Sequence, residues 1–124
     1  MQRVVVDAIH LDQIREHGGL PGLRDEGLLE SALARPRHKW TYKKRPDLAS
    51  LAAAYGFGIV KNHPYRDGNK RVAFLTMVVF LGLNGFDLVA AETDVVTTML
   101  TAAAGGCSEA ELAKWIRSNI VELR

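Results

Sequence analysis

Residues 63–83 read HPYRDGNKRVAFLTMVVFLGL, and this stretch decides the fold that we expect. From residue 72 to residue 83 it is apolar on nearly every face of a helix, which is typical of a helix at the centre of a fold. The run is too short to cross a bilayer. We therefore expect a central helix that begins near Gly68 or Asn69 and ends at Asn84-Gly85, a favourable left-handed stop.

Five further helices are expected around this one, because apolar residues recur at helical spacing between cap and stop signals. They cover roughly residues 7–17, 25–35, 46–62, 92–104 and 108–123. The second is expected to end before Pro36, since the residue ahead of a proline disfavours helical geometry. Val4-Val5-Val6 has the composition of a short strand, but the sequence offers it no partner. The predicted fold class is therefore all-α, a compact six-helix orthogonal bundle, with residues 1–124 as a single domain.

The composition excludes several classes of protein. Of the 124 residues, 48% are hydrophobic and 24% are charged, as in ordinary soluble proteins. The single cysteine, Cys107, excludes an internal disulfide framework and a cysteine metal cluster. The first residues lack the basic start, apolar run and cleavage site of a secretory signal. A reducing cytoplasm is therefore the expected location.

The charge is unevenly distributed along the chain. Residues 1–71 hold 13 Lys and Arg against 8 Asp and Glu, whereas residues 72–124 hold 3 against 6. The first part is therefore expected to meet an anionic partner, such as a nucleotide, an RNA or an acidic protein. Residues 35–45, which we call the basic connector, combine Trp40 and Tyr42 with Arg35, Arg37, Lys39, Lys43, Lys44 and Arg45. A solvated loop would explain the charges, but an exposed Trp indicates a binding surface.

Cationic residues stand where the central helix begins. The first N–H groups of a helix have no internal acceptor, and the helix dipole is positive there, so this end binds phosphate. Gly68 lets the backbone approach a ligand closely, because it has no Cβ. Lys70 and Arg71 oppose the dipole, and a local conflict of this kind is expected at functional sites. A bound polyanion would turn that conflict into an attraction.

His63 and Asp67 add the remaining groups that phosphoryl transfer requires. Histidine titrates near neutrality, so His63 could take a proton from an attacking hydroxyl group. Asp67 is a candidate ligand of Mg²⁺, which is usually held by one or two carboxylates plus substrate phosphates. Taken singly, Asp67 and Asn69 are explained as cap or turn residues, and the others as surface residues. Their conjunction within residues 63–71 favours a phosphate-binding transferase site.

The motif His-Pro-Tyr-Arg-Asp-Gly-Asn-Lys-Arg at residues 63–71 resembles the signature of the Fic/Doc superfamily. Fic proteins carry His-Pro-Phe-x-x-Gly-Asn-Gly-Arg-x-x-Arg, and Tyr65 is a conservative change at the Phe position, which should still anchor the loop in the core. The Doc branch has Lys in place of the second Gly and lacks the final Arg, which agrees with Lys70 and Phe74. Residues 18–36 also resemble the N-terminal segment of Doc-like toxins.

This resemblance implies a toxin that is a kinase. Doc toxins are the stable partners of toxin–antitoxin pairs, and a phage-encoded member transfers the γ-phosphate of ATP to a threonine of elongation factor Tu, which stops translation. Carried over to this chain, His63 would be the catalytic base and Asp67 the carboxylate that holds Mg²⁺. Phe74 in place of the final Arg favours γ-phosphate transfer over AMP transfer. The phosphates of ATP would be held by Gly68, Asn69, Lys70 and Arg71.

Two other functions stay open, namely AMP transfer to hydroxyl groups, as in Fic relatives, and a toxin-like fold that binds without chemistry. Many Fic proteins carry an inhibitory helix of the form Ser/Thr-x-x-x-Glu-Gly/Asn. Here Glu26 is the only Glu followed by Gly or Asn, and Gly22 stands four residues before it. A separate antitoxin is therefore the expected partner, with no membrane and no direct DNA binding. In Fic relatives a flap beside the active site holds the target, and we expect the basic connector to take that place.

Overall fold

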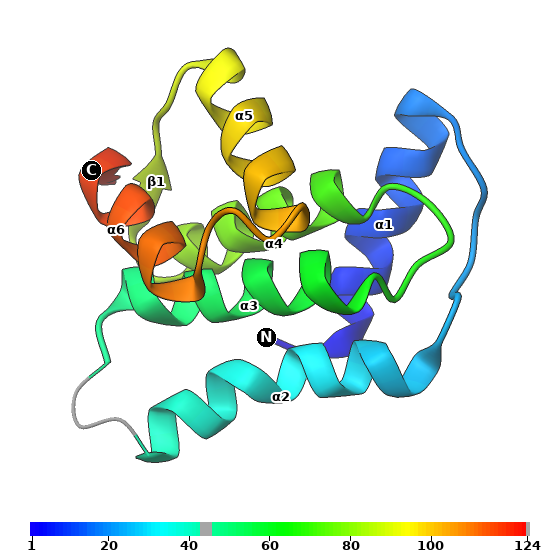
Figure 1. Cartoon of the computed structure of the whole chain (residues 1–124), viewed down its shortest axis with the longest axis horizontal. Coiled ribbons are helices and arrows are strands. Elements are labelled where there is room, and N and C mark those ends of the chain that lie inside the picture. Colours follow the sequence, from blue (N-terminus) through cyan, green and yellow to red (C-terminus); the bar gives the residue numbers. More distant parts are fainter. Residues whose placement is uncertain (43–45, 124) are drawn as a thin grey trace.

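The computed structural model describes residues 1–42 and 46–123, and this part of the chain is mostly helical (Figure 1). It contains six helices and two short strands, which confirms the all-α fold class. The helices are α1 (Arg3–His17), α2 (Glu26–Tyr42), α3 (Leu48–Asn62), α4 (Asn69–Leu83), α5 (Glu92–Ala103) and α6 (Glu109–Asn119). The strands are β1 (Phe86–Leu88) and β2 (Ile120–Glu122), which pair antiparallel.

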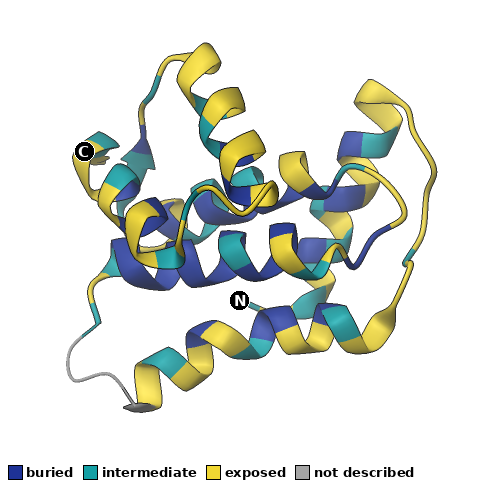
Figure 2. Cartoon of the chain, in the orientation of Figure 1, coloured by how far each residue is buried: buried dark blue, intermediate teal, exposed yellow. Residues whose placement is uncertain are grey.

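Helices α3 and α4 lie at the centre of the molecule. Figure 2 shows α3 largely in the colour of buried residues, whereas α4 alternates between buried, intermediate and exposed residues. Two glycines of α3 allow this packing. A Cβ at Gly56 would overlap the sulfur of Met77 in α4, and a Cβ at Gly58 would lie 3.1 Å from the carbonyl oxygen of Ala32 in α2. The two glycines therefore mark places of close approach, where α3 is enclosed by α4 and α2.

Helix α1 begins at Arg3 and includes Val4–Val6, so this valine run is helical despite its strand-like composition. Val6 is fully buried, whereas Val4 is 66% exposed. Side chains two residues apart share one face of a strand but lie on different sides of a helix. The burial of Val6 in the core therefore favours the helix over the local preference of valine for strands.

Helix α2 continues through Pro36 to Tyr42, so the predicted end before Pro36 is also wrong. A proline inside a helix removes one hydrogen bond and costs about 3 kcal/mol. Contacts of the second half of the helix offset this cost. Pro36 is buried, and both Arg35 and Lys39 form ion pairs with Glu109 of α6.

The C-terminal helix is shorter than the sequence predicts. We expected it to continue to residue 123, but α6 ends at Asn119 and residues 120–122 form β2. Asp87 of β1 stands opposite Val121, and Gly85, at a φ of 89°, turns the chain from α4 into β1. Periodicity within one segment does not reveal such a partner strand, so the pair was missed.

The turn between α3 and α4 lies beside the segment that joins α1 to α2 (Figure 1). Leu23 and Tyr65 form an isolated antiparallel bridge. The backbone N–H of Arg24 donates to the carbonyl of Pro64 over 2.7 Å, and that of Arg66 donates to the carbonyl of Gly22 over 3.1 Å. Residues 18–25, which we call the α1–α2 segment, therefore border the turn that carries the motif.

Candidate functional site

The turn begins at His63, which caps the C-terminal end of α3 in the left-handed conformation, with φ 52° and ψ 53°. Pro64 follows and cannot continue the helix. The side chain of His63 is exposed, so its ring is open to solvent and to a second substrate. His63, the predicted base, thus lies at the first position of the turn, where α3 ends.

Arg24 of the α1–α2 segment fixes this helix end. Its guanidinium donates from Nε to the carbonyl of His63 over 2.8 Å and from a terminal nitrogen to the carbonyl of Asn62 over 2.9 Å. A cation at the C-terminus of a helix is favourable, because the last carbonyls lack partners and carry the negative end of the dipole. Arg24 was not predicted, because its separation from His63 by 39 positions in the chain gives no local signal.

Tyr65 and Asn69 close the turn on itself. Tyr65 is 1% exposed, which confirms that it anchors the loop in the core. The side-chain oxygen of Asn69 accepts from the backbone N–H of Tyr65 over 2.9 Å, and its amide donates to the carbonyl of Tyr65 over 2.9 Å. Asn69 is 3% exposed. Its side chain is therefore occupied within the turn, and only its backbone N–H remains to meet a phosphate.

Asp67 has its carboxylate held by two backbone donors. One oxygen accepts from the N–H of Gly68 over 3.0 Å, and the other accepts from the N–H of Leu20 over 3.3 Å. A Cβ at Gly19 would lie 2.7 Å from the second oxygen, so the close approach of the α1–α2 segment requires glycine there. Asp67 is exposed, and the fixed carboxylate is open to a ligand.

This single carboxylate fits a magnesium ion that arrives with a nucleotide. Within residues 1–42 and 46–123, no group of three or more His, Cys, Asp or Glu could hold a metal ion by itself. Mg²⁺ needs no such cluster, since it keeps several waters and is held by one or two carboxylates and by substrate phosphates. The residues at the turn therefore fit Mg²⁺ bound to ATP rather than a metal held by the protein alone.

The start of α4 has the features of a phosphate site. Gly68 is the N-cap residue of α4 and has the left-handed conformation, with a φ of 77°. It makes no side-chain hydrogen bond to the first N–H groups of the helix. The first backbone N–H groups of the helix, from Asn69 to Arg71, therefore keep their capacity to donate. Lys70 and Arg71 are both exposed at the same end. The free amides, the positive end of the helix dipole and two exposed cations thus lie at the same end of α4.

A cavity of about 620 Å³ opens beside this helix start, between α1, α4 and α5. Lys70 and Arg71 line one side of it. The rest of the wall is mostly apolar and includes Phe74, Leu75, Val95, Val96, Met99 and Leu100. Its volume lies within the range of roughly 300–1,000 Å³ that is usual for small-molecule sites. This cavity leaves no signal in the local sequence, because three separate helices form it.

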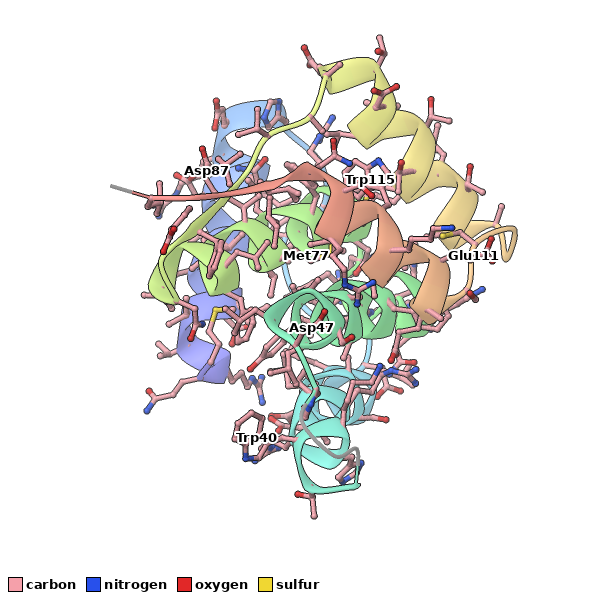
Figure 3. The ribbon with its side chains drawn as sticks, turned by 90° about the vertical axis from the view of Figure 1, so that its left-hand side faces the viewer. Trp40, Asp47, Met77, Asp87, Glu111 and Trp115 are labelled. Carbon is pink, nitrogen blue, oxygen red and sulfur yellow. The ribbon has the colours of Figure 1, made fainter. Side chains whose placement is uncertain are left out.

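The basic connector does not lie beside the turn, so its predicted place is wrong for residues 35–42. These residues form the second half of α2, and Trp40 lines a hollow of about 400 Å³ with Leu51 and Phe80. Leu51 stands twelve positions before His63, which is roughly 18 Å along α3. Trp40 is 66% exposed and lies at the periphery (Figure 3). Residues 43–45 lie outside the described part of the chain.

Comparisons with known proteins give relatives of one kind. The family model described as "Fic/DOC family" matches residues 2–81. Over 110 residues the chain is 31% identical to "Protein kinase doc" of Escherichia phage P1, an alignment that covers 89% of this chain and 86% of that protein. Over 79 residues it is 42% identical to "Toxin Doc" of Mycolicibacterium smegmatis, which covers 63% of this chain and 60% of the relative. The range matched by the family model includes both the turn and the α1–α2 segment.

Proposed function

Because the chain belongs to the Fic/Doc family, we propose that it is a Doc-type toxin, a cytoplasmic protein kinase that acts as one domain over residues 1–124. It transfers the γ-phosphate of ATP to a hydroxyl group of a translation factor, with elongation factor Tu as the expected target. The names of the two relatives, a protein kinase and a toxin, support this proposal. The observation that carries it is the convergence of an exposed histidine, an oriented carboxylate and a cationic helix start on one turn.

The phosphates of ATP are held at the start of α4. The N–H groups of residues 69–71 donate to phosphate oxygens, and the side chains of Lys70 and Arg71 neutralise their charge. Gly68 leaves room for this approach, because it has no Cβ. Asp67 would hold Mg²⁺, and the ion would supply neutralisation of the charge that develops on the phosphates during transfer. Each of these groups except the amide of Asn69 belongs to an exposed or half-buried residue.

His63 acts on the second substrate. Its ring takes the proton of the target hydroxyl as that oxygen forms a bond to the γ-phosphorus, while the bond from phosphorus to ADP breaks. Left-handed geometry at His63 and the two hydrogen bonds from Arg24 hold the backbone on which this ring is mounted. The exposed ring leaves space for a protein segment to bring its hydroxyl group close.

Phe74 favours transfer of the γ-phosphate over transfer of AMP. It stands where the Fic signature has a second Arg, and in this structure it lines the cavity beside the start of α4. No guanidinium is therefore supplied from that position to a triphosphate. The cationic side chains at the start of α4 are then Lys70 and Arg71, which suits the binding of one phosphoryl group at the reacting position.

An antitoxin is the proposed regulator. The apolar wall of the cavity suits the apolar face of a helix from a separate protein. Acidic residues on that helix would meet Lys70 and Arg71, which the cavity and the phosphate site share. An antitoxin bound there would keep phosphates from the start of α4.

The position of the transferred label tests the proposal. The native protein is incubated with a cell lysate and ATP that is labelled at either the α- or the γ-phosphate. Label from the γ position alone is the expected result. Label from the α position would show AMP transfer, and no label from either position would favour a binding module without chemistry.

A further inference from the structure

A buried histidine from α1 contacts the candidate site from the protein interior. His10 is 4% exposed, and its Nε2 lies 3.0 Å from the carbonyl oxygen of Asp67. A carbonyl oxygen can only accept, so Nε2 carries the proton and donates it. The contact joins positions that are 57 residues apart, so no local pattern in the sequence indicates it.

This hydrogen bond fixes one peptide group at both of its ends. The carbonyl of the peptide between Asp67 and Gly68 accepts from His10, and its N–H donates to the Asp67 carboxylate over 3.0 Å. If the peptide rotated, the carboxylate would lose that donor, and the left-handed backbone of Gly68 would shift as well. His10 thus acts through one peptide on two groups, the carboxylate proposed to hold Mg²⁺ and the first turn proposed to hold phosphate.

The ring of His10 is itself held in place by Tyr65. The two rings are stacked, with 3.9 Å between their centroids and an angle of 9° between their planes. The Tyr65 hydroxyl donates to Asp7 over 2.7 Å. Burial, and next the hydrogen bond to Asp7, raise the pKa of Tyr65, so its hydroxyl stays protonated and remains a donor. Residues of α1 therefore approach the turn twice, at Tyr65 and at Asp67.

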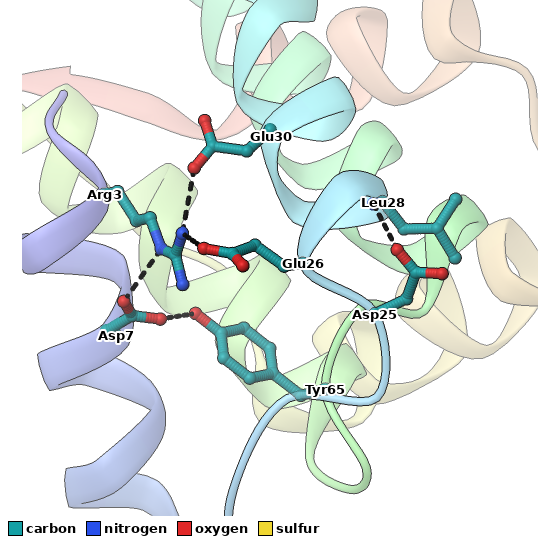
Figure 4. A network of polar contacts seen from close by, with 7 residues as sticks. All are labelled: Arg3, Asp7, Asp25, Glu26, Leu28, Glu30 and Tyr65. Carbon is teal, nitrogen blue, oxygen red and sulfur yellow. Dashed lines mark hydrogen bonds and ion pairs between the residues drawn. The ribbon is translucent and has the colours of Figure 1, made fainter.

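Figure 4 shows how this arrangement continues to α2. Arg3 donates from Nε to Asp7 over 3.2 Å. Its Nη1 also donates to two carboxylates of α2, over 2.5 Å to Glu26 and 3.0 Å to Glu30. Asp7, which accepts from the Tyr65 hydroxyl, is thus fixed by the ion pairs of Arg3, which also join α1 to α2. The Tyr65 ring cannot turn away from His10 without disturbing these contacts.

We propose that His10 is a positioning residue for phosphoryl transfer, which orients the Asp67–Gly68 peptide and through it the proposed metal and phosphate ligands. The inference rests on the proposed function for its link to catalysis. A purely structural histidine would contribute to stability alone, so the two roles predict different behaviour of the turn.

Two substitutions of His10 distinguish the contribution of its N–H donor from that of its ring. His10→Phe keeps a flat ring on Tyr65 but cannot donate to Asp67, whereas His10→Gln keeps an N–H donor of similar reach and loses the ring. Amide exchange at Gly68 is measured by NMR in the protein without nucleotide, and kcat and KM are measured with Mg²⁺ and ATP. If His10→Phe does not fold, His10→Met replaces it, because Met has the length of Gln without the donor.

We expect faster exchange at Gly68 in His10→Phe, by at least about tenfold, because the peptide is no longer held. The same variant should lose up to about a hundredfold in kcat, with the KM for the target protein unchanged, since small misplacements of reacting groups have effects of that size. His10→Gln should recover most of both losses.

Three results would overturn the inference: native exchange at Gly68 in His10→Phe, native kcat in that variant, or a His10→Gln protein no better than His10→Phe. The exchange measurement needs no activity. If the native protein transfers no phosphate, the proposed function fails while the exchange at Gly68 still decides whether His10 holds the peptide.

Discussion

At the scale of single residues, adjacent residues of the motif have different roles. Asn69 is buried and bonds both backbone groups of Tyr65, whereas Lys70 next to it is exposed and lines the cavity. A buried amide that closes a turn contributes to stability, because its loss leaves the N–H and the carbonyl of Tyr65 unsatisfied. An exposed cation contributes little to stability and acts through the anion that it meets.

This difference predicts that two adjacent substitutions both weaken ATP binding but differ in their effect on stability. Asn69→Ala should lower the free energy of unfolding by about 1–3 kcal/mol and should weaken ATP binding, because the turn loosens. Lys70→Ala should weaken ATP binding while it changes stability by no more than about 0.5 kcal/mol. Denaturant titration and calorimetry measure the two quantities. Equal stability of the Asn69→Ala and native proteins would contradict the closing role of Asn69.

At the scale of elements, α3 has to be fixed at both ends, since its last residue precedes the proposed base. Arg24 fixes its C-terminal end. Asp47 caps its N-terminal end, where the carboxylate accepts from the N–H of Ser50 over 2.8 Å and pairs with Arg117 of α6 over 2.7 Å. Arg117, and after it the cap bonds of Ser50, hold the pKa of Asp47 well below its usual range.

The lowered pKa of Asp47 predicts a pH-dependent contribution to stability. A carboxyl group with a lowered pKa in the folded state stabilises the protein above its ordinary pKa of about 4, and this contribution is lost as the pH falls below that value. Asp47→Ala should therefore lower the free energy of unfolding by about 1 kcal/mol at pH 7. The difference from the native protein should shrink towards pH 2. Denaturant titrations across this range check it, and a constant difference would contradict the prediction.

Much of the element pattern could be predicted from local sequence. The central helix follows from hydrophobic periodicity, and the resemblance of the motif to its family implies the anchoring of Tyr65 in the core. The continuation of α2 through Pro36 could not, because ion pairs with Glu109 from a distant helix stabilise it. The nine-residue motif similarly indicates the site, but His10 and Arg24 reach it only through the folded chain.

At the scale of the whole molecule, the cavity and the phosphate site share one rim. α5 contributes Leu100, which is 51% exposed, to the apolar wall of the cavity that Lys70 and Arg71 also line. Such exposed apolar side chains beside a polar site mark a surface that another chain can cover. This arrangement supports regulation by an antitoxin that covers the apolar wall and the cationic helix start together.

The proposed antitoxin surface predicts an effect of Leu100→Asp. The change places a carboxylate in an apolar contact, so neutralisation by the antitoxin should weaken by at least about tenfold while the fold is retained. Val89→Asp is the matched control, since Val89 is 55% exposed and does not line the cavity. Binding titrations with the product of a neighbouring gene measure the difference. Equal neutralisation of both variants would place the antitoxin on another surface.

The most direct test of the central claim compares the native protein with His63→Ala. Both are incubated with a lysate, Mg²⁺ and ATP labelled at the γ-phosphate. His63 is exposed and caps α3 through its backbone, so the substitution should leave the fold intact. We expect the native protein to label a cellular protein and His63→Ala to lose that transfer while its circular dichroism spectrum is unchanged. Equal labelling by the two proteins would contradict a catalytic role for His63 and the kinase function that depends on it.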